Sequence, residues 1–359
     1  MPAAIICSYL TQMERSVEET RETSPRIGSV IIGRNEGERL VACLRSQEIS
    51  NLVYVDSGSL DDSVANALAA GATVVRLSSP PNFSAARARN AGLRALLEHI
   101  PDVEYIQMTD GDCALREGWI EKSVAALRAD HTLALVFGRR RERHPEHPYN
   151  ALCDDEWDLP VGEAAGCGGD AMFRAAALLS VSGYKESMIA GEDSELSMRL
   201  RKKGWRLARI DAEMTWHDAD IRRFSQFWNR ARRSGHAYAE LAHLHPDASG
   251  PDWPRSCHSI VFWGALMPGA LLTAIFLAIL YHPLCWIAAA ALLMPWPAKI
   301  VQLYRRRLRQ GVEPKIALAN ASLMMLGKLP QFLGLSRFHY GRWLNCAGPI
   351  IEYKGPGRA

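Results

Sequence analysis

Short apolar segments that each end in a polar, glycine-bearing turn dominate the first half of the chain. We expect buried strands at residues 27–33, 52–55 and 73–77. A helical pattern lies between each pair of strands: the first begins near Glu38, and the second ends at Gly71. The order of strand, polar turn, helix and strand is typical of βαβ units in a doubly wound α/β sheet. Ligands bind such sheets beyond the carboxyl ends of the strands, so the polar turns mark the predicted site.

Two carboxylates, Asp110 and Asp112, come directly after the apolar segment 105–108 with Gly111 between them. Residues two apart in a strand point to the same side, so both carboxylates would converge where the chain leaves the sheet. Oxygen ligands of this kind suit Mg²⁺ or Mn²⁺, although acidic residues around a glycine also fill ordinary surface turns. Asp56 ends the neighbouring strand 52–55, and we expect it to share one crevice with Asp110.

Several ordered motifs give the chain a family resemblance. They are Ser29–Glu36, Val55–Asp61, Ala88–Gly92, the Asp110–Asp112 triplet, Gly191–Asp193 before a helix, and His217 after a strand-like run. Over residues 26–240 the chain resembles family 2 glycosyltransferases, which bind nucleotide sugars with the GT-A fold. The resemblance therefore implies a GT-A doubly wound mixed sheet. Ser57 stands where the family has a second acid, and Gly33 and Arg34 stand where it often has proline and an aromatic residue.

The resemblance implies a divalent metal, Mg²⁺ or Mn²⁺, at the acidic triplet. Asp112 would ligate the ion directly, and Asp110 would contact the ribose or reach the ion through water. His217 is similar in position to a residue that completes the site in some family members. Imidazole suits Mn²⁺ better than Mg²⁺, whereas a lone histidine is more often structural.

The donor is expected to be a UDP- or GDP-sugar. A carboxylate at Asp56 would accept the imide N–H of a uracil or a comparable donor on another base, and a plain turn aspartate is the alternative. Arg87 and Arg89 lie at the start of a predicted helix, where guanidinium groups would attract the diphosphate of the donor. The alternative is that one of the two is a solvated surface charge. The expected donor-binding residues are Asn35, Glu36, Asp56, Ser57, Gly58, Arg87, Arg89, Asn90 and Asp110.

The resemblance assigns the catalytic base to Asp193, which would take the acceptor's proton during a single inverting displacement. The helix dipole would hold a carboxylate in the first turn of this helix ionised, although acids are common there as capping residues. The run from Gly166 to Asp170 resembles a small-residue segment beside the acceptor, but a tight loop would have the same composition. The expected acceptor-side residues are Glu192, Gly168, Gly169 and Asp170.

The last third of the chain has the composition of membrane helices. The span from Ser259 to Tyr281 holds no charged residue and is long enough for a bilayer core of about 30 Å. A buried soluble helix pair is the alternative. The expected organisation is a tail at 1–24, a GT-A domain at 25–245, a linker at 246–258 and a membrane-associated helical region at 259–359. That region would contain a hairpin of spans at about 259–281 and 283–304, and an interfacial or re-entrant segment at about 316–335.

Charge and cysteine patterns indicate a protein at the cytoplasmic face of an inner membrane. Arginines before the first span and the Arg305–Arg307 cluster after the second put both hairpin ends in the cytoplasm. Eight cysteines without Cys-x-x-Cys spacing read as reduced thiols, and the first 24 residues show no secretory signal. A formal charge of +3 across 359 residues is too small to indicate nucleic-acid binding.

The sequence thus predicts an inverting, metal-dependent transferase that adds a single sugar to a lipid or lipid-linked acceptor. Processive synthases of the superfamily carry Gln-x-x-Arg-Trp near this point, whereas this chain has Gln226–Arg230 with arginine one place late and no following tryptophan. One alternative is nevertheless a processive polysaccharide synthase. A second is a non-catalytic scaffold that binds nucleotide sugars. A nucleotidyltransferase fits less well, because Gly33–Glu36 is a poor phosphate loop.

Overall fold

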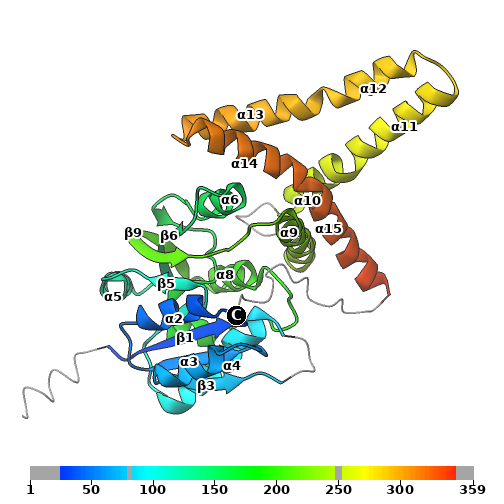
Figure 1. The fold of residues 1–359 in the computed structure, drawn as a ribbon. Coiled ribbons are helices and arrows are strands. Elements are labelled where there is room, and N and C mark those ends of the chain that lie inside the picture. The colour runs from blue at the N-terminus through cyan, green and yellow to red at the C-terminus, as the bar shows by residue number, and fades with distance from the viewer. Residues whose placement is uncertain (1–24, 79–82, 247–252, 345–359) are drawn as a thin grey trace, which may run out of the picture.

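A computed structural model describes residues 25–78, 83–246 and 253–344 of the chain. The predicted tail at 1–24, most of the first half of the predicted linker, and residues 345–359 lie outside the described residues. The described part has an α/β domain built on one mixed sheet, joined to long C-terminal helices that project from it (Figure 1).

The sheet contains nine strands in the order β3-β2-β1-β4-β8-β6-β9-β5, and β7 pairs with β9. Strands β3, β2, β1 and β4 are mutually parallel, β8 runs antiparallel to its neighbours β4 and β6, and β6 is parallel to β9. This arrangement confirms the predicted mixed, doubly wound sheet. The strands are β1 (Ile27–Gly33), β2 (Leu52–Asp56), β3 (Thr73–Arg76), β4 (Tyr105–Asp110), β5 (Cys113–Leu115), β6 (Leu133–Glu142), β7 (Gly162–Glu163), β8 (Ala171–Arg174) and β9 (Arg206–His217).

Helices cover the sheet and bury its apolar residues. Gly92 lets α4 approach the sheet closely, because a Cβ atom there would overlap the side chain of Val30 on β1. In α8, Leu196 and Leu200 share one fully buried face, as their spacing predicts, and Gly204 follows the helix with a positive φ. The helices of this domain are α2 (Glu38–Arg45), α3 (Ser63–Ala69), α4 (Ala85–His99), α5 (Trp119–Ala129), α6 (Pro148–Glu156), α7 (Ala175–Ser180), α8 (Glu192–Lys202) and α9 (Phe224–Leu244).

Three helices of the described chain are long and apolar enough to cross a membrane, namely Trp253–Leu280, Cys285–Arg309 and Pro314–Trp343. The first begins at Trp253, inside the segment predicted as linker. The first two form an extended hairpin at the top of Figure 1. The elements are α10 (Trp253–Val261), the π-helical turn η1 (Phe262–Leu266), α11 (Met267–Leu280), α12 (Cys285–Leu293), α13 (Pro295–Arg309), α14 (Pro314–Leu326) and α15 (Lys328–Trp343).

The third long helix returns to the α/β domain, because α15 packs along α9 (Figure 1). Two glycines let the helix backbones touch. A Cβ atom at Gly235 on α9 would overlap the backbone of Gln331, and one at Gly334 on α15 would overlap the carbonyl oxygen of Arg232. The segment predicted to be interfacial or re-entrant therefore includes a part fixed against the α/β domain; its relation to a bilayer stays a prediction.

Candidate active site

The sequence motifs meet at the carboxyl ends of β1, β2 and β4. The chain leaves β4 at Asp110, passes through Gly111 and enters β5 after Asp112, so both acids sit at the switch between two strands. A cavity of about 880 Å³ opens at this edge. Among the predicted residues, its lining contains Asn35, Glu36, Ser57, Arg89, Asp110, Asp112, Gly169, Glu192, Asp193 and His217.

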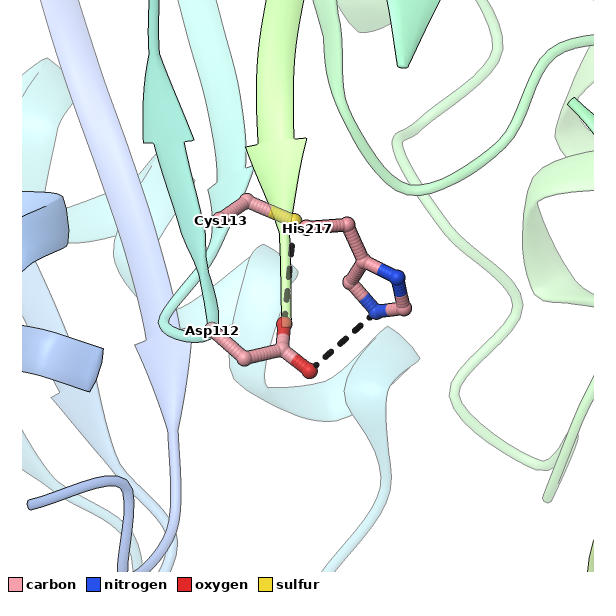
Figure 2. Close-up of side chains that lie close together, drawn as sticks. All are labelled: Asp112, Cys113 and His217. Atoms are coloured by element: carbon pink, nitrogen blue, oxygen red, sulfur yellow. Dashed lines mark hydrogen bonds and ion pairs between the residues drawn. The ribbon is translucent and has the colours of Figure 1, made fainter. Parts of the chain in front are cut away.

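Asp112 and His217 form the candidate metal centre (Figure 2). Their side chains are buried, and Nε2 of His217 lies 3.4 Å from Oδ2 of Asp112. The register places His217 at the end of β9, directly opposite Cys113 on β5. Nδ1 on the other side of the ring lies 2.7 Å from Oε2 of Glu142, the last residue of β6. The imidazole is thus held between two carboxylates.

The chemistry of these groups fits a divalent cation. Burial and the charge of Arg140 lower the pKa of His217, but Asp112 and Glu142 outweigh them and the pKa is raised overall. The two carboxylates beside the imidazole therefore favour a positive charge there. A bound cation supplies this charge when it takes the place of the imidazole proton. The third member of the cluster is the Cys113 thiol, whose pKa burial raises well above its usual value. Mg²⁺ and Mn²⁺ prefer oxygen and imidazole donors to a thiol, so the carboxylate and the imidazole are the donors that suit such an ion.

Arg89 ties the acidic triplet to the predicted base. Its guanidinium is buried and donates from Nη2 to Oδ1 of Asp110 at 2.8 Å and from Nη1 to Oε1 of Glu192 at 2.7 Å. Oδ1 of Asp193 lies 4.0 Å from the same Nη1. A single arginine on α4 therefore joins the end of β4 to the first turn of α8, and all four residues line the cavity.

The protonation of Asp193 depends on more than the helix dipole. Burial, followed by the neighbouring charge of Glu192, raises the pKa of Asp193 to about 7, although Arg89 opposes the rise. Desolvation and a like charge thus work against the helix dipole, which by itself would favour the ionised carboxylate. A base with a pKa near the working pH is well matched to proton transfer.

The segment Gly166–Asp170 supports the site through its backbone and through one carboxylate. Oδ1 of Asp170 accepts the backbone N–H of Asp110 at 2.9 Å, and Oδ2 accepts the hydroxyl of Thr215 at 3.2 Å. A Cβ atom at Gly169 would press on the side chains of Arg89 and Asp110, so glycine is required where the loop passes them. Asp170 and Gly168 do not line the cavity, and their contact with an acceptor stays a prediction.

On the donor side, Asn35, Glu36 and Ser57 line the cavity, whereas Asp56 and Gly58 do not. Oδ2 of Asp56 accepts the backbone N–H groups of Gly58 and Ser59 at 3.0 and 3.1 Å. Asp56 therefore holds the turn after β2, as the alternative interpretation of this residue, a plain turn aspartate, predicts. Its contact with a nucleotide base stays a prediction.

Two other predicted donor-binding residues lie outside the cavity lining. Asn90 donates its amide to the carbonyl of Tyr184 at 2.8 Å and accepts the backbone N–H of the same residue, so it fixes the chain before α8. Arg87 donates to the carbonyl of Ser78 at 2.8 Å. Both side chains therefore have a structural position in this molecule, and their contact with a donor stays a prediction.

Sequence reasoning missed Glu142 and Arg140, both on β6. Arg140 is buried, lies 3.6 Å from Oδ2 of Asp170 and stacks over the ring of Trp157. The only local signal is a run of three arginines at the end of an apolar strand, of which Arg139 and Arg140 are buried and Arg141 is exposed. The cavity also continues to α9 and α10, and the lining there includes Arg230, Arg233, Tyr238 and Trp253.

Comparison with known proteins shows which family part of the chain resembles. The family model "Glycosyl transferase family 2" matches residues 30–160. Residues 30–160 are therefore similar to glycosyltransferase family 2. Pre-mycofactocin glycosyltransferases from two Mycobacterium tuberculosis strains are each 28% identical over 257 residues, covering 66% of this chain and 49% of theirs. The chain thus spans about half the length of these curated relatives.

A solved structure shows the same fold as this chain. A mannosyltransferase from Pyrobaculum calidifontis, solved in complex with GDP-mannose and Mn²⁺, aligns with a TM-score of 0.53 at 18% identity. The alignment covers 89% of this chain and 88% of that one, so it includes most of the C-terminal helices as well as the α/β domain. At this identity the likeness establishes the GT-A architecture.

Proposed function

We propose that the chain transfers a single sugar, with inversion, from a UDP- or GDP-sugar to a lipid or lipid-linked acceptor at the cytoplasmic face of an inner membrane. The observation that carries the proposal is the meeting of Asp110, Asp112, Asp193 and His217 in one cavity, although they come from three separate parts of the sequence. The similarity of residues 30–160 to family 2 and the GT-A fold support a nucleotide-sugar donor.

The donor would lie over the carboxyl ends of β1, β2 and β4. Ser57 and Asn35 line the cavity there, and Asp112 with His217 would hold Mg²⁺ or Mn²⁺ beside the donor's diphosphate. When bound, such an ion supplies positive charge that stabilises the departing nucleoside diphosphate. The mannosyltransferase with the same fold was solved with Mn²⁺ and a nucleotide sugar, which supports this class of ligand.

Asp193 would act as the general base. The acceptor hydroxyl loses its proton to the Asp193 carboxylate while its oxygen forms a bond to the anomeric carbon. The bond between that carbon and the diphosphate oxygen breaks on the opposite side, and the nucleoside diphosphate leaves with the electron pair. One displacement of this kind inverts the anomeric configuration.

The acceptor would reach the base from the membrane side. Trp253 lines the cavity and is also the first residue of the first long apolar helix, so the cavity extends to the start of the helical hairpin. Arg230 and Tyr238 on α9 line the same part of the cavity. This continuity supports an acceptor that is held at the membrane surface while its hydroxyl projects toward Asp193.

A two-stage assay on the detergent-solubilised protein tests the proposal. Nucleotide sugars are first screened with Mn²⁺ for a rise in melting temperature, because a ligand that binds only the native state stabilises it. The stabilising donor is then radiolabelled and incubated with membranes of the expression host, and the chloroform-extractable products are separated by size. The proposal expects one sugar on a lipid; a long polymer indicates a processive synthase, and donor binding without turnover indicates a scaffold.

A further inference from the structure

We propose that Glu142 is a positioning residue that sets the tautomer and orientation of His217 for metal binding. This inference rests on the metal site of the proposed function and adds a residue that no sequence motif contains. Glu142 ends β6, His217 ends β9, and the two strands pair with these residues in register. Both side chains are buried, and Nδ1 of His217 lies 2.7 Å from Oε2 of Glu142.

The contact defines which ring nitrogen carries hydrogen. A carboxylate accepts hydrogen bonds and does not donate them, so Nδ1 of His217 must be the donor to Glu142. In a neutral imidazole the hydrogen on Nδ1 leaves Nε2 with its lone pair, and Nε2 is the atom that faces Asp112. Glu142 therefore directs the only metal-binding atom of the ring toward the other proposed ligand.

Glu142 is itself held in place on both oxygens. Oε1 accepts the backbone N–H of Ala219 at 3.0 Å while Oε2 accepts from His217. The backbone N–H of Glu142 donates to Oδ1 of Asp154 on α6 at 2.7 Å. Because both carboxylate oxygens are engaged and the backbone of Glu142 is held as well, the carboxylate has little freedom to turn and also fixes the plane of the imidazole. Carboxylates behind a metal-binding histidine commonly serve this purpose.

These contacts make Glu142→Gln a direct test of the role of the carboxylate, because the substitution keeps the shape of the side chain and changes only its hydrogen bonding. Both partners of the Glu142 carboxylate, Nδ1 of His217 and the N–H of Ala219, are donors. A glutamine has one accepting oxygen and one donating NH₂ group, so it can satisfy only one of them. If the NH₂ group faces His217, the ring must accept at Nδ1, and the hydrogen moves to Nε2, where it blocks a metal.

The experiment measures Mn²⁺ affinity by electron paramagnetic resonance of the free ion, with the full-length protein in detergent and without donor. Glu142→Gln and Glu142→Ala are expected to weaken Mn²⁺ binding by roughly 10- to 100-fold, the effect typical of such supporting carboxylates. The matched control is Glu213→Gln, which removes a carboxylate from the same strand as His217 but breaks an exposed pair with Arg141. The control should bind Mn²⁺ like the wild type.

A nitrogen NMR signal gives a second readout that a purely structural role would not change. In protein labelled with ¹⁵N-histidine, the resonances absent from His217→Gln belong to His217. The wild type should show a hydrogen-bearing Nδ1, and Glu142→Gln should lose that state. Unchanged Mn²⁺ affinity and an unchanged Nδ1 signal in a folded Glu142→Gln protein overturn the inference.

The failures of the two proposals are distinguishable. A wild-type protein that binds Mn²⁺ but transfers no sugar counts against the proposed function and leaves the role of Glu142 intact. A wild-type protein that binds no Mn²⁺ overturns the metal site and this inference together. If Glu142→Ala does not fold, the isosteric Glu142→Gln variant still decides the outcome through its NMR signal.

Discussion

Nη2 of Arg89 donates to Oδ1 of Asp110 at 2.8 Å, so the first acid of the Asp-Gly-Asp triplet is already paired with a buried arginine. The sequence suggests Arg89 as a ligand for the donor's diphosphate. In the structure it also serves as the counter-charge that allows Asp110 and Glu192 to lie together in a largely buried site. Replacing Arg89 by a neutral residue would therefore leave the carboxylates of Asp110 and Glu192 without their shared positive partner.

Replacing Arg89 with methionine should therefore destabilise the protein by about 3–5 kcal/mol, the usual effect of removing one member of a buried ion pair. The melting temperature of the purified protein measures the loss. Arg94→Met is the control, because Arg94 lies on the same helix but is mostly exposed in its pair with Glu186. An exposed pair contributes about 0–1 kcal/mol, so equal losses in both variants would contradict the proposed role of Arg89.

The rate of transfer should depend on the ionisation of Asp193. The base works only when deprotonated, and its pKa is raised to about 7. Activity should therefore fall as the pH decreases through 7 and level off above it. Because Glu192 contributes to the rise, Glu192→Gln should lower the pKa and move this acidic limb to lower pH. Profiles of initial rate against pH, recorded for the wild type and for Glu192→Gln, measure the acidic limb and its shift. If the limb has the same pH midpoint in both proteins, its source is not Asp193.

Mn²⁺ should stabilise the native protein through Asp112. A ligand that binds only the folded state adds about 2.7 kcal/mol when its concentration is a hundred times its Kd. We expect a Mn²⁺-dependent rise in melting temperature in the wild type and none in Asp112→Ala. Asp130→Ala serves as the control, since Asp130 lies in an exposed pair with Arg206. A full Mn²⁺ response in Asp112→Ala would remove this residue from the metal site.

The contact between α9 and α15 should tolerate no added side chain. At Gly334 a Cβ atom would overlap backbone atoms of α9, so Gly334→Ala must push the helices apart and lower the melting temperature. At Gly269 on α11, a Cβ atom would meet no described atom within 4 Å apart from its chain neighbours and the backbone of its own helix, so Gly269→Ala should leave stability unchanged or slightly higher. Equal melting temperatures for the two variants would show that α15 does not pack on α9 in this way.

The sequence predicts the parts of the site that are local and misses those that are not. Asp110 and Asp112 could be placed because a strand, a glycine and two acids are adjacent in the chain. Arg140 and Glu142 reach the cavity region only because β6 pairs with β8 and β9, which come later in the sequence. Pairing between distant strands leaves no periodic pattern, so neither residue had a signal beyond its type and its place in the strand.

The pKa of Asp193 could not be predicted from the sequence for a related reason. Its position in the first turn of a helix could be read from Gly191 and the periodicity that follows. Its environment could not, because its burial and the charges of Arg89 and Asp110 come from elements far away in the chain. Helix-end electrostatics are local, whereas desolvation is a property of the assembled fold.

Transfer of labelled sugar from UDP-glucose or GDP-mannose into extractable lipid, compared between wild type and Asp193→Asn, tests the central claim most directly. Asp193→Asn keeps the shape of the side chain but removes the base, so it should lose at least about 100-fold of the transfer rate. Its Mn²⁺ affinity and melting temperature should match those of the wild type. Wild-type transfer by the folded Asp193→Asn protein would show that the acids gathered in this cavity do not carry out the proposed chemistry.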